Sequence, residues 1–371
     1  MQEDLFSILT RWRIHIFPLC ADIKQMYRHI WMDPEDCDFQ RIVWRANPEE
    51  TIKHYKLLSV TYGEASAPFQ AVRTLYQLAT DLEETYPLAA PIVRRDFYMD
   101  DVLTGESTVA RAIALQSELM GMMKEANFTL RKWSSSYSEV LKALPEEMRE
   151  TSLPLRFDED DSIKTLGLFW NPATDEFKFT VEPLSLQPVT KRSVLSQIAK
   201  VFDPLGLISP VTVRGKILMQ ILWKLQLGWD EKIDEGMTRS WLSYCKELCS
   251  VANLRIPRCV TTNAATSYHL HGFSDASEKA YAAAVYLLTT TKSGKTHSNL
   301  VCSKTKIAPS KQISLPRLEL GGALLLSRLV SSVVTALPVT LTEIHGWTDS
   351  MVVKYWLNSP PNGGELLLQI E

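Results

Sequence analysis

Two adjacent aspartates, Asp100 and Asp101, interrupt the apolar stretch FYMDDVLTG at 97–105. Carboxylates on a tight turn between buried strands cost free energy unless they are paired, hydrogen-bonded or bound to metal. A third acid, Asp22, ends the apolar segment IFPLCADI. Such oxygen ligands suit Mg²⁺, and two ions about 4 Å apart stabilise the attacking and leaving oxygens of phosphoryl transfer. The alternative is an ordinary turn in which Asp side chains accept backbone N–H groups.

A second set of three acids is spread over the last hundred residues. Asp275 ends an apolar strand, Glu319 lies on an apolar helix, and Asp349 ends a strand just before a helix. One acid in such a setting is usually a cap or an edge residue. Three acids in strand–helix–strand order are harder to explain in that way, and they predict a second site for divalent metal.

The chain as a whole has the composition of a soluble globular protein. Its 371 residues suggest two or three domains, and its hydrophobic content of 45% and charged content of 22% are ordinary. We find no apolar run near the ~20 residues of a membrane helix and no signal peptide, so we expect an intracellular, cytoplasmic protein without a membrane partner. The spacing of Cys245, Cys249, His269 and His271 is too loose to predict zinc, so the six cysteines are interpreted as free thiols.

Basic residues gather in two segments despite a net charge of −3. Residues 291–317 contain six lysines or arginines and no acid, and 191–224 contain six with the single acid Asp203. Solvated faces explain many such runs. Beside metal sites of the kind above, they become candidate phosphate contacts.

The pattern of the first half predicts a mixture of short strands and helices. We expect strands at 16–23, 39–45 and 55–62, a short helix at 24–32, and helices that begin near Pro68 and after Ser107 or Thr108. The segment PIVRRDFYMDDVLTG is interpreted as two strands that meet at the Asp pair, and a hairpin is expected around 171–175.

The second half changes from helices to a strand-rich pattern. Three helices are expected within 189–250, followed by three strands at about 267–307. A helix at 315–337 and a strand leading into a helix at 343–358 complete the pattern.

The first set of acids resembles the palm of reverse transcriptases. YMDD between apolar residues is similar to their catalytic turn, and ADIKQMYRHI, LLSVTYGEASAPFQA and NFTLRKW resemble further palm motifs in the same order. LGLFW resembles their primer-grip hairpin. QRIVWR and KRSVLSQIAKVFDPLGLISPVTVRGKILMQ are similar to polyproteins of BEL/Pao-type retrotransposons. The resemblance implies RNA-directed DNA polymerase activity, in which a primer 3′-hydroxyl attacks the α-phosphate of a dNTP.

The resemblance also implies residue roles. Asp22 and Asp100 would be the principal metal ligands with Asp101 assisting, and Tyr27 would exclude a 2′-hydroxyl. Lys132 would approach the triphosphate. The residues that would bind template, primer or nucleotide are Tyr27, Tyr62, Gly63, Pro68, Tyr98, Met99 and Lys132.

The second set of acids resembles the ribonuclease H fold. There, an Asp on the first strand, a Glu on the first helix and an Asp at the end of the fourth strand share two Mg²⁺ ions, with Mn²⁺ as a substitute. This maps Asp275, Glu319 and Asp349 as catalytic metal ligands acting on the RNA strand of an RNA–DNA hybrid. The family's fourth acid and last elements have no counterpart after Asp349, so this part is expected to be incomplete.

The expected fold is an α+β palm at 1–145, a primer-grip hairpin and helical thumb or connection at 146–260, and an α/β ribonuclease H-like domain at 261–371. Only 21 residues precede Asp22, so the fingers are expected to be largely missing and polymerisation impaired. Expected partners are an RNA template, a DNA primer, RNA–DNA hybrid and dNTP, with protease and integrase segments in the parent polyprotein, whose chemistry would also include DNA integration.

Two alternatives stay open. The chain could be a truncated or domesticated fragment that only binds nucleic acid. The other is an aspartic peptidase. It is less favoured because such enzymes need Asp-Thr/Ser-Gly, and the chain offers only TDSM and SDAS, which lack the glycine.

Overall fold

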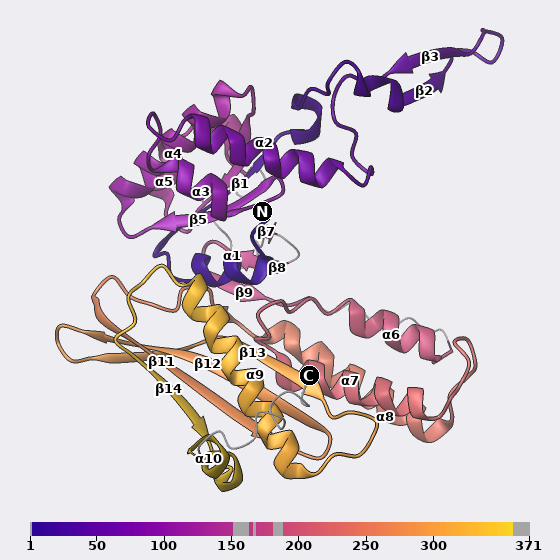
Figure 1. Cartoon of the computed structure of the whole chain (residues 1–371), viewed down its shortest axis with the longest axis vertical. Coiled ribbons are helices and arrows are strands. Elements are labelled where there is room, and N and C mark those ends of the chain that lie inside the picture. The colour runs from indigo at the N-terminus through magenta and orange to yellow at the C-terminus, as the bar shows by residue number, and fades with distance from the viewer. Residues whose placement is uncertain (1, 151–162, 166–167, 181–187, 359–371) are drawn as a thin grey trace. The chain divides into compact units, whose positions relative to one another are not determined.

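The structure is a computed structural model that describes residues 2–150, 163–165, 168–180 and 188–358. These residues belong to two compact units (Figure 1). Unit 1 comprises Met1–Ile8 and His15–Asp158, and unit 2 comprises Leu9–Ile14 and Glu159–Glu371. The expected class, an antiparallel sheet with helices followed by a helical region and an α/β part, is confirmed. The three-part domain division stays a prediction.

Unit 1 is built on a four-stranded antiparallel sheet with the order β4-β5-β1-β6. Its core is apolar because the strands and the helices α2, α3 and α4 bury one face each. Thr108 caps α4 as expected, since its hydroxyl accepts the Arg111 N–H at 3.3 Å. The elements of unit 1 are β1 (Phe17–Ile23), β2 (Arg41–Trp44), β3 (Lys53–Lys56), α2 (Ala67–Asp81), α3 (Ala89–Arg95), β4 (Phe97–Tyr98), β5 (Asp101–Glu106), α4 (Val109–Glu125), β6 (Leu130–Ser134) and α5 (Ser138–Lys142), with 3₁₀ turns η1 (Met26–His29), η2 (Asp36–Phe39) and η3 (Glu146–Met148).

Three local expectations for unit 1 are wrong. The residues PIVRR form the end of helix α3 rather than a strand, because the buried positions 89, 90, 92 and 93 recur at helical spacing. The helix expected at 24–32 is the single 3₁₀ turn η1. The strand expected at 55–62 ends at Lys56, and β3 pairs only with β2 in a hairpin exposed along its length.

The helical part of unit 2 agrees with the expectation for 189–250. Thr190 and Ser193 form a reciprocal capping box at the start of α6, and Asp234 caps α8. A small antiparallel sheet with the order β10-β9-β8-β7 includes the expected hairpin at 171–175. The elements are β7 (Ile163–Thr165), β8 (Leu168–Asn171), β9 (Glu176–Lys178), α6 (Lys191–Ala199), α7 (Ser209–Lys224), α8 (Glu235–Cys249), η4 (Ser250–Asn253) and β10 (Ile256–Pro257).

The main sheet of unit 2 has the order β13-β12-β11-β14, and only the β11–β14 pair is parallel. Helix α9 packs on β11 and β12, and α7 packs on β13 (Figure 1). The elements are β11 (Ala265–Ala276), β12 (Ala280–Thr291), β13 (Thr296–Ile307), α9 (Leu315–Ala336), β14 (Glu343–Thr348) and α10 (Met351–Asn358).

Helix α9 is long and apolar enough by length and composition to cross a membrane, which the sequence pattern did not lead us to expect. It nevertheless packs against a sheet and buries seven residues, including Leu326 and Val333. Such burial is typical of the core helix of an α/β domain.

Two buried arginines join the start of the chain to the rest of unit 2. The Arg13 guanidinium donates to the carbonyl oxygens of Arg258, Val301 and Pro257 at 2.6–2.9 Å. Burial lowers the pKa of Arg13 to about 10. Arg258 in turn makes a bidentate pair with Asp175, at 2.6 and 2.8 Å. Because both arginines are fully buried, these partners are needed to offset the free-energy cost of burying their charges.

We expect Asp175→Ala to destabilise unit 2 by roughly 3–5 kcal/mol, because it leaves the buried Arg258 charge without its carboxylate. Denaturant unfolding of the full chain measures the change. Asp230→Ala, which breaks the exposed pair with Arg192, is the matched control and should destabilise unit 2 far less, because solvent screens an exposed ion pair. Equal losses in the two variants would contradict the buried-pair argument.

Candidate functional site

The three acids of the second set come together in unit 2. Asp275 lies near the end of β11, Glu319 in the first turns of α9, and Asp349 directly after β14. One ligand oxygen of each lies within 4.8 Å of the other two. We call Asp275, Glu319 and Asp349 the carboxylate trio. Like charges so close repel one another unless a cation or a proton lies between them.

Glu319 is the member of the trio that most clearly lacks a protein partner. Among the described residues, its buried Oε2 has no hydrogen-bond partner, which is costly for a carboxylate oxygen. Burial raises the pKa of Glu319, and the neighbouring Asp275 and Asp349 raise it further. A divalent cation would offset both effects, because the oxygen would coordinate it and its positive charge would compensate the negative charge of the cluster. These oxygen ligands therefore fit Mg²⁺ or Mn²⁺.

Gly322 lets α9 approach the strand that carries Asp275. A Cβ at this position would lie 3.3 Å from the Asp275 carbonyl oxygen, and a Cβ added to Gly321 would lie 3.6 Å from the ring of Tyr281. These glycines were not among the predicted site residues, although a pair of glycines in an apolar helix is a signal of close packing.

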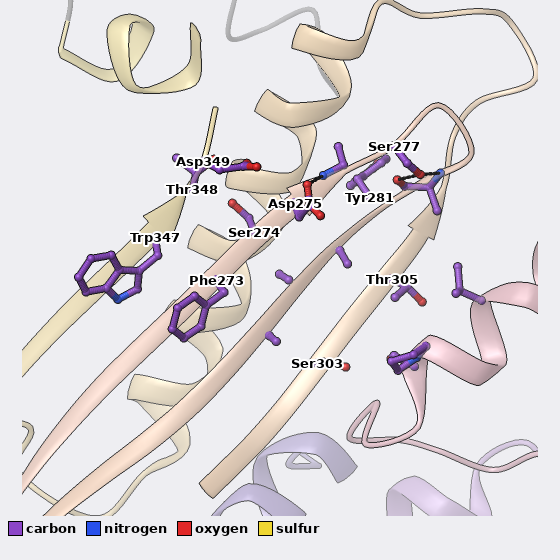
Figure 2. A pocket seen from close by; sticks show the side chains of 18 residues that line it. Phe273, Ser274, Asp275, Ser277, Tyr281, Ser303, Thr305, Trp347, Thr348 and Asp349 are labelled. Carbon is purple, nitrogen blue, oxygen red and sulfur yellow. Dashed lines mark hydrogen bonds between the residues drawn. The ribbon is translucent and has the colours of Figure 1, made fainter. Parts of the chain in front are cut away.

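An open groove of about 680 Å³ runs from the trio across the sheet of unit 2 (Figure 2). Asp275 and Asp349 line one end of it, and the side chains of Phe273 and Trp347 lie side by side next to them. The two rings stack with 6.3 Å between centroids and are about half exposed. The other wall carries the hydroxyls of Ser209 from α7 and of Ser303 and Thr305 from β13.

The basic segments contribute less to this groove than their sequence suggested. Lys304 and Lys306 are exposed, but they alternate along β13 with Ser303 and Thr305, which line the groove. The side chains of Lys304 and Lys306 therefore project from the face of the sheet opposite the groove. Lys191 is buried, with its ammonium 3.5 Å from the centre of the Trp223 ring.

Asp22, Asp100 and Asp101, the first set of acids, lie in unit 1 around the β4–β5 hairpin. Asp22 on β1 is directly opposite Asp101 on β5, and Asp100 occupies the two-residue loop with Met99. Met99 has φ 57°, in the left-handed region that such hairpin loops require and that costs a non-glycine residue on the order of 1 kcal/mol. The predicted hairpin of paired acids is confirmed.

Asp22 is already paired with cations in this structure. Arg131 donates to both of its carboxylate oxygens, at 3.0 and 3.2 Å, and Lys132 Nζ lies 3.6 Å away. Within the described part of the chain, Asp22, Asp100 and Asp101 do not form a cluster as tight as the carboxylate trio. The role of Lys132 at a triphosphate stays a prediction, and Arg131 was not among the predicted site residues. A metal at Asp22 would have to displace Arg131.

The other residues singled out by the resemblance lie in η1, in β4, and just before or at the start of α2. Tyr27 in η1 and Tyr62 have ring centroids 6.3 Å apart, and burial and Asp100 raise the pKa of Tyr27. Gly63 has φ 99° in the turn before α2, and Pro68 lies in the first turn of that helix. Tyr98 is the last residue of β4.

Asp101 predicts a pH dependence. Burial, Asp100 and Asp22 raise its pKa from 3.8 to about 6. The folded state therefore binds this proton more tightly than the unfolded state does. The stabilisation that comes from protonated Asp101 is full below pH 3.8 and is lost as pH rises through 6. In metal-free buffer, Asp101→Asn should stabilise unit 1 by about 1–2 kcal/mol at pH 8 and by much less at pH 4. Hydrogen exchange of the β1 and β5 amides measures this; an equal effect at both pH values would contradict it.

Residues 190–350 match the family model for the Pao retrotransposon-like RNaseH-like domain. A search of curated proteins found no match. Among solved structures, the foamy viral protease-reverse transcriptase in complex with RNA/DNA hybrid is similar over the whole chain, with TM-score 0.58 and 14% identity. Its dRH form in complex with ds DNA gives TM-score 0.58 and 15% identity.

The present chain spans 44% and 56% of these two foamy viral chains, about half their length. At such identities the likeness concerns the fold. The chain thus has a fold similar to a protease-reverse transcriptase, and its residues 190–350 are similar to the Pao retrotransposon-like RNaseH-like domain.

Proposed function

We propose that this chain is a nucleic-acid-processing segment of a retrotransposon polyprotein whose unit 2 hydrolyses the RNA strand of an RNA–DNA hybrid. The observation that carries the proposal is the convergence of Asp275, Glu319 and Asp349 from three elements, with a buried Glu319 oxygen to which no described residue donates a hydrogen bond. The RNaseH-like match at 190–350 and the hybrid in one foamy viral complex support it.

In this mechanism the carboxylate trio would hold two Mg²⁺ ions, or Mn²⁺ in their place. The ions would supply Lewis-acid activation of water and of the phosphoryl oxygen. The chain's own residues position the substrate: Phe273 and Trp347 offer apolar faces to a sugar or base at the open end of the groove. The hydroxyls of Ser209, Ser303 and Thr305 can donate to backbone phosphates, which fixes register without sequence preference.

The test is Mg²⁺-dependent cleavage by the full chain of an end-labelled RNA strand, presented as RNA–DNA hybrid, as RNA–RNA duplex and as single strand. Cleavage restricted to the hybrid supports the proposal. Hybrid binding without cleavage in either Mg²⁺ or Mn²⁺ would favour the alternative of a fragment that only binds nucleic acid.

For unit 1 we propose RNA-directed DNA polymerase chemistry at Asp22, Asp100 and Asp101, on an RNA template with a DNA primer and dNTP. The hairpin register that sets Asp22 opposite Asp101 supports this, while the Arg131–Asp22 pair opposes metal entry. The parent element would act in the cytoplasm beside protease and integrase segments.

Primer extension in Mg²⁺, compared between the wild type and Asp100→Asn, tests the polymerase proposal. Extension that is lost in the variant supports it. In an active protein, Tyr27→Ala should increase ribonucleotide incorporation if Tyr27 excludes the 2′-hydroxyl; unchanged incorporation would remove that role.

A further inference from the structure

Strands β11 and β14 carry a second cluster of metal-ligating side chains outside the carboxylate trio. It consists of His269, Glu343 and His345, whose ligand atoms all lie within 4.8 Å of one another. Glu343 Oε2 lies 2.9 Å from His345 Nε2 and 3.6 Å from His269 Nδ1. Two imidazole nitrogens therefore converge on one carboxylate oxygen.

The parallel pairing of the two strands brings these residues together. His269 is directly opposite Glu343, and His271 is directly opposite His345. Side chains two residues apart share a face of a strand. A Cβ on Gly272 would contact α9, as Leu326 is the nearest side chain, so the histidines occupy the face away from that helix.

Neighbouring rings restrain the orientation of His345. The His271 ring stacks on it with 4.9 Å between centroids and 20° between planes. His271 Nδ1 in turn accepts the indole N–H of Trp347 at 3.2 Å. Side chains whose rotamers are held by packing and supporting hydrogen bonds need less rearrangement to bind a ligand.

We propose that His269, Glu343 and His345 form a binding site for a zinc ion, with water as the fourth ligand. Two imidazoles and one carboxylate are a common ligand set for Zn²⁺ with an open position. The carboxylate trio offers only oxygen, which suits Mg²⁺ instead. The three ligand atoms already lie within 4.8 Å of one another, so small side-chain shifts suffice to place each of them at Zn–ligand distances of about 2.0–2.2 Å.

A zinc ion at this site would link the edge strand β14 to β11. Asp349 follows β14 directly, and Asp275 lies near the end of β11. The same two strands thus carry an imidazole-containing site and, toward their other end, two members of the carboxylate trio. The zinc site does not depend on the proposed nuclease activity, because its ligands are separate from the trio.

Equilibrium dialysis of the metal-free full chain against Zn²⁺, in excess Mg²⁺ to saturate the trio, tests the proposal. The wild type should bind one Zn²⁺ that His345→Gln and Glu343→Gln bind at least about 100-fold more weakly, since even outer partners of a metal site cost roughly 10–100-fold. Co²⁺ should give a tetrahedral absorption spectrum in the wild type. Circular dichroism confirms that the variants fold.

His54→Gln is the matched control, because His54 is exposed on β3 in unit 1 and outside the cluster. It should bind Zn²⁺ as the wild type does. The proposal is overturned if the wild type binds no Zn²⁺ in excess Mg²⁺, or if all four proteins bind equally, as they would at a surface thiol such as Cys249. Loss of binding in Asp349→Asn but not in His345→Gln would also overturn it.

Discussion

Asp275→Asn is expected to reduce Mg²⁺-dependent cleavage of an RNA–DNA hybrid by about 10²–10⁴-fold. Metal ions contribute several kcal/mol to the stabilisation of charge in phosphoryl transfer, and each 1.36 kcal/mol is tenfold in rate. Asn keeps the shape of the side chain but removes the charge that the cluster with Glu319 and Asp349 offers to a cation. Single-turnover cleavage with saturating protein measures the chemical step directly.

Glu278→Gln is the matched control for this experiment. Glu278 is an exposed acid three residues from Asp275 in the turn between β11 and β12, and it is not part of the carboxylate trio. It should leave the cleavage rate unchanged, and both variants should retain hybrid binding. If Asp275→Asn cleaves like the wild type, the trio is not the catalytic centre.

Gly206→Ala is expected to destabilise unit 2 by about 3–5 kcal/mol. Gly206 has φ 69°, where a Cβ costs roughly 1–2 kcal/mol, and that Cβ would also overlap the Ser303 carbonyl oxygen. The close approach is fixed by two hydrogen bonds, from Ser303 N–H to the Leu205 oxygen at 2.8 Å and from the Ser303 hydroxyl to the Gly206 oxygen. Denaturant unfolding, with hydrogen exchange in β13, measures the loss.

Gly294→Ala is the control that separates the free-energy cost of backbone strain from that of steric overlap. Gly294 has φ 79°, but nothing lies within 4 Å of the Cβ that alanine would add. It should therefore cost only about 1–2 kcal/mol. Because Gly206 lies just before Ser209, Gly206→Ala should also move one wall of the groove and weaken hybrid binding, whereas Gly294→Ala should not. Similar effects of the two substitutions would contradict a role for the Gly206–Ser303 contact.

The sequence predicted well where a local pattern decides the structure. The capped helix after Thr108, the three helices of 189–250 and the hairpin at Asp100 and Asp101 all follow from caps, periodicity and turn chemistry. It also predicted which acids belong to the trio, because their order along the chain matches the order of strand, helix and strand.

The sequence predicted poorly where the outcome depends on contacts between distant segments. Nothing local to Arg131 indicates that it pairs with Asp22, 109 residues away. The run PIVRR was too short for its periodicity to separate helix from strand. His269, Glu343 and His345 looked unrelated because they meet only through the parallel pairing of β11 with β14.

Unit 2 includes residues 9–14, which are synthesised long before the rest of it, and this has a consequence for biosynthesis. Arg13 donates to the carbonyl oxygen of Val301, which lies 288 residues later in the chain. At translation rates of roughly 5–20 residues per second, roughly 15–60 s pass between the synthesis of Arg13 and that of this acceptor. Unit 1 can fold on the ribosome during this interval, while Arg13 still lacks its acceptor on Val301. A gene fragment starting at 159 would encode a unit 2 without Arg13 and without Trp12, whose buried ring packs against Trp170 and Phe177. A synthetic peptide that carries both residues should rescue the folding of this fragment in trans.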